Sequence, residues 1–166
     1  MKSLILIIVL GLTQFAMAQA KPLSNSKVDY NGFETLTSEI GAYREGRLIQ
    51  IDTFNLYSQD GNTIILDTRS KAAYDEIHIA GAVHLNFSDF TVAKLAKVIP
   101  NKATRILIYC NNNIESNFSS LEDKLAPLAL NIPTFINLFG YGYTNVYELQ
   151  DYLMESDPRI EFVKGK

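Results

Sequence analysis

The sequence has no tryptophan, one cysteine and two histidines among its 166 residues. A single cysteine excludes an internal disulfide. His78 and His84 lie far from Cys110 in the chain and make a poor metal-ligand set, so we expect no metal and no cofactor. The 15 basic and 18 acidic residues give a formal net charge of −3. This balance argues against a broad basic surface for nucleic acid or anionic lipid.

The N-terminus has the pattern of a secretory signal peptide. Lys2 precedes an apolar run over residues 4–12, and Ala16-Met17-Ala18 supplies the small residues that a signal peptidase needs. The alternative is a membrane anchor, but the run is shorter than the roughly 20 residues of a spanning helix. We therefore predict a signal peptide over residues 1–18 and an exported protein, periplasmic or secreted, with no membrane contact after cleavage.

Export makes the lone thiol of Cys110 the residue of greatest interest. Oxidising compartments convert spare thiols into mixed disulfides or higher oxides. An exported chain with one cysteine therefore either buries it as an inert side chain or keeps it for its reactivity.

The rest of the chain alternates short apolar runs with helical patterns. Residues 19–32 are polar and are expected to form a flexible lead-in, followed by a domain over residues 33–155 and a tail over residues 156–166. Strands are expected at 48–51, 63–66, 82–85, 105–109 and 145–147, and helices at 52–59, 70–76, 89–98 and 133–139. This order predicts an α/β fold with a mostly parallel central sheet flanked by helices. Ligands bind outside the carboxyl ends of such strands, which is where Cys110 falls.

Two stretches of sequence are more specific than this alternation. The first joins residues 66–69 (LDTR) and Tyr74 to residues 78–85 (HIAGAVHL), and the second joins residues 106–110 (ILIYC) to residues 142–149 (GYTNVYEL). In this order they resemble the signature of the rhodanese-like domain family. The resemblance covers about residues 47–150.

The resemblance implies a sulfurtransferase. Family members take a sulfane sulfur from a donor, such as thiosulfate or a protein persulfide, as a cysteine persulfide and pass it to an acceptor such as a thiol. It gives Cys110 the catalytic position and Asn111, Asn112, Asn113 and Ser116 the substrate loop. The thiolate is the nucleophile, so backbone N–H groups near a helix N-terminus are expected to lower its pKa.

The loop after Cys110 departs from the family pattern. It has no glycine and no arginine, and in an ungapped alignment Glu115 stands where the family arginine would be. A carboxylate there would repel thiosulfate and raise the thiol pKa, which favours a larger or neutral donor such as a protein persulfide. Extra sequence over residues 112–132, called the insertion below, offers a surface for a protein partner.

The other polar residues of the signature have structural interpretations too. Asp67, Arg69 and His78 could line the pocket rim, but we favour structural roles for them because buried charges and polar groups need partners. The three asparagines could donate to a sulfur anion or simply form the bend of the loop. If Cys110 is unreactive, the chain is a rhodanese-like binding module. If the thiol is exposed and acidic, it could act as a redox sensor.

Overall fold

The computed structural model describes residues 27–165. The signal peptide predicted at residues 1–18 lies outside the described residues, as does the lead-in up to residue 26. No helix within residues 27–165 has the length and apolar character needed to cross a membrane.

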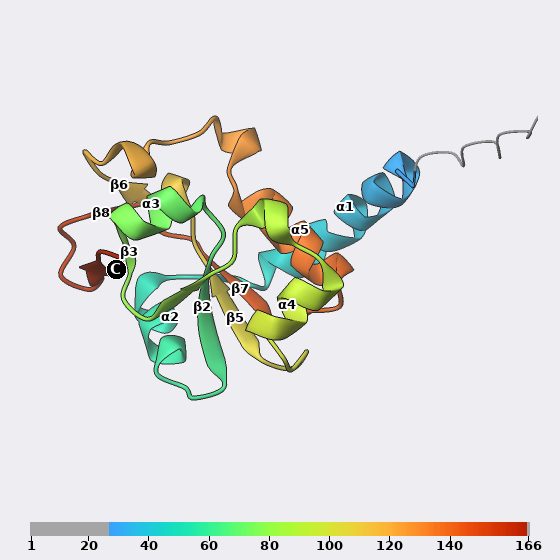
Figure 1. Cartoon of the computed structure of the whole chain (residues 1–166), viewed down its shortest axis with the longest axis horizontal. Coiled ribbons are helices and arrows are strands. Elements are labelled where there is room, and N and C mark those ends of the chain that lie inside the picture. Colours follow the sequence, from blue (N-terminus) through green and yellow to red (C-terminus); the bar gives the residue numbers. More distant parts are fainter. Residues whose placement is uncertain (1–26, 166) are drawn as a thin grey trace, which may run out of the picture.

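A five-stranded parallel sheet in the order β1-β7-β5-β2-β4 forms the centre of the protein (Figure 1). Its strands are β1 (Leu48–Ile49), β2 (Thr63–Asp67), β4 (Ala82–His84), β5 (Arg105–Ile108) and β7 (Val146–Leu149). The predicted α/β fold with a central parallel sheet is confirmed. Because β5 is the middle strand, its carboxyl end opens at the centre of one sheet edge.

Helices cover both faces of this sheet, as the two faces of β5 show. Leu107 belongs to a core cluster with Phe54 of α2, whereas Ile106 and Ile108 belong to a second cluster with Phe135 of α5. Successive strand residues point to opposite faces, so a continuous apolar run is what a strand buried on both sides requires. The helices are α1 (Tyr30–Glu45), α2 (Ile51–Ser58), α3 (Lys71–Glu76), α4 (Val92–Val98) and α5 (Asn131–Gly140).

The insertion folds as short turns above the sheet (Figure 1). It contains three 3₁₀ turns, η2 (Asn111–Asn113, which begins just before it), η3 (Ser119–Leu121) and η4 (Ala126–Leu128), and the strand β6 (Ile114–Glu115). A further 3₁₀ turn, η1 (Phe87–Asp89), precedes α4. Strand β6 pairs in parallel with β8 (Leu153–Met154), which ties the insertion to the chain after the sheet.

Both ends of the described chain differ from the sequence expectation. Helix α1 begins at Tyr30, inside the expected lead-in, where the Asp29 side chain accepts a hydrogen bond from the Gly32 N–H and caps it. At the other end, β9 (Phe162–Val163) pairs antiparallel with β3 (His78–Ile79). The expected tail over residues 156–166 thus contributes a strand, because His78 and Ile79 offer it an open edge.

Candidate active site at Cys110

Cys110 lies two residues after Ile108, the last residue of β5, at the carboxyl edge of the sheet. Its exposed fraction is 1%, yet it lines a cavity of about 210 Å³. The wall around the thiol comes from β1, β7, α1 and the two ends of the insertion: Arg44, Leu48, Asn112, Asn113, Ala129, Asn131, Glu148, Leu149 and Gln150. Cys110 is therefore buried and forms part of the wall of a small cavity.

Backbone N–H groups from two separate segments act on the Cys110 thiol and lower its pKa. They belong to Asn112, two residues after the cysteine, and to Leu130 and Asn131, where α5 begins. No side chain caps α5, the Ile132 N–H donates to the Ala129 carbonyl, and Pro133 has no N–H, so the donor at the start of this helix is the N–H of Asn131. The insertion thus leaves Cys110 and returns to it, and its two ends together form a cradle of N–H donors.

The electrostatic effects on the thiol oppose one another. Burial is the largest and raises the pKa of Cys110, and the negative charge of Glu148 raises it further. Hydrogen bonds from the N–H groups of Asn131, Asn112 and Leu130 lower it, but the pKa stays above its usual value. The thiol is therefore mostly protonated at neutral pH.

Asn113 holds the backbone around the thiol. Its Oδ1 accepts from the Cys110 N–H at 3.0 Å and from Asn131 Nδ2 at 3.0 Å, and its Nδ2 donates to the carbonyls of Leu149 and Asp151 at 2.8 and 3.1 Å. One buried amide therefore joins the ends of β5, β7 and α5.

The side chains of Asn111 and Asn112 hold the insertion in place. Asn111 donates to the carbonyls of Ser120 and Glu122, each at 3.0 Å, while Asn112 donates to the carbonyl of Lys124 at 2.6 Å and accepts from its N–H at 3.3 Å. Of the two interpretations left open for the asparagines, these contacts favour the structural one for the side chains. Of Asn112, it is the backbone N–H that lowers the pKa of the Cys110 thiol.

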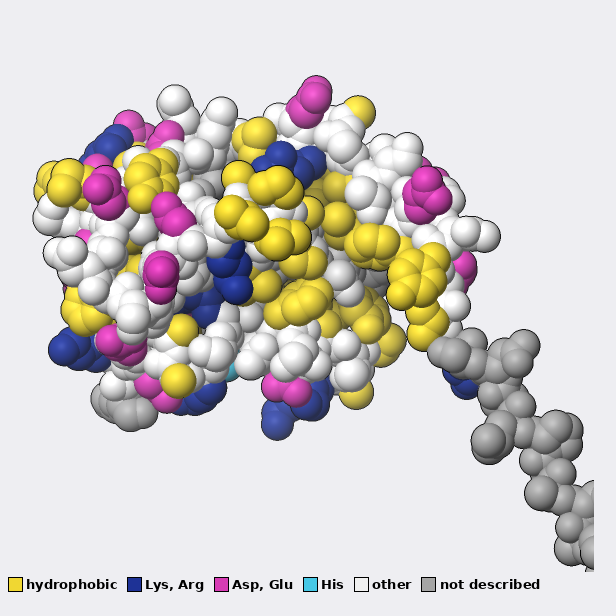
Figure 2. Space-filling view, turned by 90° about the horizontal axis from the view of Figure 1, so that it is seen from above, with side chains coloured by type: hydrophobic (Ala, Val, Ile, Leu, Met, Phe, Trp, Pro, Cys, Tyr) yellow, Lys and Arg dark blue, Asp and Glu magenta, His cyan; other side chains and the backbone are white. Residues whose placement is uncertain are grey.

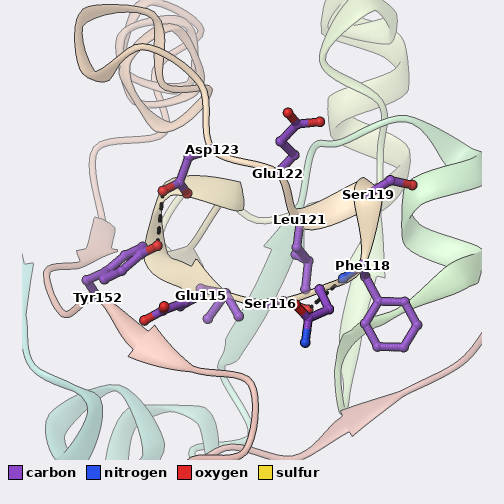
Figure 3. A pocket seen from close by; sticks show the side chains of 10 residues that line it. Glu115, Ser116, Phe118, Ser119, Leu121, Glu122, Asp123 and Tyr152 are labelled. Atoms are coloured by element: carbon purple, nitrogen blue, oxygen red, sulfur yellow. Dashed lines mark hydrogen bonds between the residues drawn. The ribbon is translucent and has the colours of Figure 1, made fainter.

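Ser116 and Glu115 lie apart from the thiol, and neither lines its cavity. Ser116 Oγ donates to Glu155 and accepts from the Phe118 N–H, and Glu115 is exposed in β6. Both line a separate pocket of about 310 Å³ within the insertion, where Glu115 lies beside Tyr152 (Figure 3). The ungapped alignment of Glu115 with the family arginine fails because the insertion leads the chain away after Asn113. The carboxylate that acts on the thiol is Glu148.

Asp67 and Arg69 form a buried ion pair beneath the sheet edge, away from the residues that line the cavity. Arg69 Nη2 lies 2.6 Å from Asp67 Oδ2 and also donates to the Ile77 carbonyl at 2.6 Å, and the Tyr109 hydroxyl donates to Asp67 at 2.5 Å. The aromatic ring of Tyr74 stacks on His78 at 3.7 Å, and His78 Nδ1 bonds the Tyr74 carbonyl at 2.7 Å. These contacts are those of residues that fix the strand ends.

Sequence reasoning missed three residues of the site: Arg44, Asn131 and Glu148. Arg44 comes from α1, which no pattern predicted, and Asn131 comes from the far end of the insertion. Glu148 occupies a position within the quoted residues 142–149 to which the resemblance assigned no role. Within residues 27–165 there is no group of three or more His, Cys, Asp or Glu side chains placed to hold a metal ion.

A parallel α/β sheet with a cysteine in a cradle of backbone donors at the end of its central strand defines a class of thiol-bearing α/β domains. A family model for the rhodanese-like domain matches residues 51–151, and the chain belongs to this family.

Several solved structures are similar to the chain. A protein from Bacillus halodurans is 17% identical over 72% of this chain and 75% of its own, with a TM-score of 0.47. The Rhodanese_3 like domain of an Anabaena sp protein is 17% identical over 63% and 94%, with a TM-score of 0.41. Thiosulfate sulfurtransferase from Pseudomonas aeruginosa is 17% identical over 72% of this chain but 20% of its own, with a TM-score of 0.45. A search of curated proteins gave no match.

Proposed function

We propose that this chain is a sulfurtransferase in which Cys110 carries a sulfane sulfur as a persulfide and passes it to a thiol acceptor. The observation that carries the proposal is the cradle: Cys110 lines a cavity where two segments of the chain meet, and the backbone N–H groups of Asn112, Leu130 and Asn131 act to lower the pKa of its thiol. Such donors stabilise the negative charge that a thiolate or a persulfide brings into a buried site.

The reaction needs no cofactor. After Cys110 loses its proton to solvent, the thiolate attacks the outer sulfur of a persulfide donor. The new bond joins Sγ to that sulfur, the sulfur–sulfur bond of the donor breaks, and the donor leaves as a thiolate with the bonding electrons. In the second step an acceptor thiolate attacks the outer sulfur of the Cys110 persulfide, and Cys110 leaves as the thiolate.

Intact-mass measurement tests this proposal. We expect the wild-type protein, incubated with glutathione persulfide or a polysulfide, to gain one sulfur that dithiothreitol removes. Cys110→Ser is the matched control and should gain none. If no donor at any concentration places a sulfur on Cys110, the catalytic proposal is wrong.

A binding module is the second candidate, favoured by the surface of the insertion. Leu125 and Leu128 are 76% and 67% exposed there, and Figure 2 shows hydrophobic side chains gathered on this face of the molecule. Exposed apolar groups of this kind suit a protein partner. In this case Cys110→Ser would retain partner capture, whereas Leu125→Ser with Leu128→Ser would lose it.

A further inference from the structure

An ion pair lines the Cys110 cavity, and its cation, Arg44, comes from a helix outside the residues that the family model matches. Arg44, in the last turn of α1, donates through Nε to Glu148 Oε2 at 2.6 Å and through Nη2 to Oε1 at 2.7 Å. Among the described residues that line the cavity, these two are the charged ones. The pair therefore sets the charge that an entering sulfur donor meets.

The geometry makes the arginine unavailable to a donor. A bidentate pair occupies the edge of the guanidinium that would otherwise hold a sulfonate or carboxylate. The Glu148 side chain is 8% exposed and that of Arg44 is 35% exposed. The carboxylate thus lies on the buried side of the pair, in the same cavity wall as Cys110, and its cation lies on the solvent side.

This arrangement affects donors according to their charge. Thiosulfate carries two negative charges in addition to that of the attacking thiolate, and like charges repel strongly in a partly desolvated cavity. A persulfide of a small thiol or of a protein brings at most one charge to the reacting sulfur. It needs only the N–H groups of the cradle.

We infer that Glu148 determines the specificity of the site: by engaging Arg44 and placing a carboxylate beside Cys110, it disfavours donors whose transferred sulfur belongs to a dianionic group, as in thiosulfate, and leaves persulfides as the substrate class. This inference rests on the sulfurtransferase function proposed above. Glu148 acts on the charge and on Arg44 and forms no bond with the transferred sulfur.

The substitution Glu148→Gln isolates the charge. Asn131 Nδ2 donates to Glu148 Oε1 at 3.3 Å, and the amide oxygen of glutamine can still accept this hydrogen bond. Arg44 would lose its anionic partner and become free to bind a sulfonate. We expect kcat/KM for thiosulfate to rise on the order of tenfold, mainly through a lower KM, because one nearby full charge is removed. With glutathione persulfide the gain should be smaller, since both donors benefit from the loss of the charge that raises the pKa of Cys110 but only thiosulfate also gains the arginine.

Two further variants make the test specific. Glu39→Gln removes an exposed carboxylate from α1 and should leave both donors unchanged. Adding Arg44→Gln to Glu148→Gln should reduce the gain with thiosulfate to that with glutathione persulfide. Arg44→Gln alone leaves the Glu148 carboxylate buried without its cation. It should lower the ratio of the thiosulfate rate to the persulfide rate below that of the wild type. This variant tests the inference even if Glu148→Gln fails to fold.

The possible outcomes distinguish a failure of this inference from a failure of the proposed sulfurtransferase function. If the wild type takes sulfur from glutathione persulfide but Glu148→Gln, folded by circular dichroism, gains nothing with thiosulfate, the inference is overturned and the function stands. If the thiosulfate gain still exceeds the persulfide gain in the double variant, the role of Arg44 is overturned. If neither donor places sulfur on Cys110 in any variant, the proposed function itself fails.

Discussion

The substitution Asn113→Ala tests whether the loop after Cys110 is a structural joint. It removes four hydrogen bonds made by a side chain with an exposed fraction of 6%. It also leaves the Cys110 N–H and the Leu149 carbonyl without these partners. A typical hydrogen bond contributes about 1 kcal/mol net, and an unsatisfied buried group costs about 1–3 kcal/mol. We expect the free energy of unfolding to fall by about 3 kcal/mol.

Urea unfolding followed by circular dichroism measures this change. Asn117→Ala is the matched control, because Asn117 lies in the same insertion with an exposed side chain, and it should change stability by no more than about 0.5 kcal/mol. Asn113→Asp keeps the two accepted hydrogen bonds but loses both donated ones, so it should fall between the wild type and Asn113→Ala. If Asn113→Ala unfolds within about 1 kcal/mol of the control, the joint described here does not stabilise the site.

Three further predictions follow from the same contacts. Asp67→Asn breaks the buried pair with Arg69 and should cost about 3–5 kcal/mol in urea unfolding; a loss below about 1 kcal/mol, typical of an exposed pair, would contradict the buried role. Burial raises the pKa of Cys110, so its iodoacetamide alkylation rate should rise with pH to a midpoint above the roughly 8.5 of a free thiol. Because the fold favours the neutral thiol, the free energy of unfolding should fall as the pH rises through that midpoint, and Cys110→Ser should not show this fall. A midpoint below the value of a free thiol would refute both statements. If the chain is exported as proposed, N-terminal sequencing of the mature protein should begin at Gln19, and an intact Met1 would exclude cleavage after Ala18.

The sheet was predictable because its strands are defined by local sequence. Residues 105–109 are a continuous run of large side chains after one arginine, and the structure buries Ile106, Leu107 and Ile108 between two helical layers. A short, continuous apolar run of this kind is typical of a strand that is buried on both faces of a sheet. The position of Cys110 at the carboxyl end of that strand follows from the run itself.

Helix α1 was not predictable in the same way. Its sequence holds two glycines, two threonines, one asparagine and one serine, which are weak helix formers. Its stability comes from contacts that are distant in sequence, such as the buried Ile40 in the core and the Tyr43 hydroxyl that donates to the Thr144 carbonyl at 2.6 Å. Arg44, carried by this helix, could therefore not be assigned to the site from the sequence.

The cradle shows why loop spacing was a poor guide to the chemistry at Cys110. The chemistry requires N–H groups at the sulfur, and it does not require that they come from consecutive residues. Here Asn112 supplies one donor, and the chain then makes an excursion before Leu130 and Asn131 supply the others at the start of α5. The closure of this excursion depends on asparagine side chains: Asn111 and Asn112 hold its backbone, and Asn113 contacts Asn131 at its end. An insertion of this length can therefore be accommodated without displacing the donors, provided that its two ends are tied together beside the thiol.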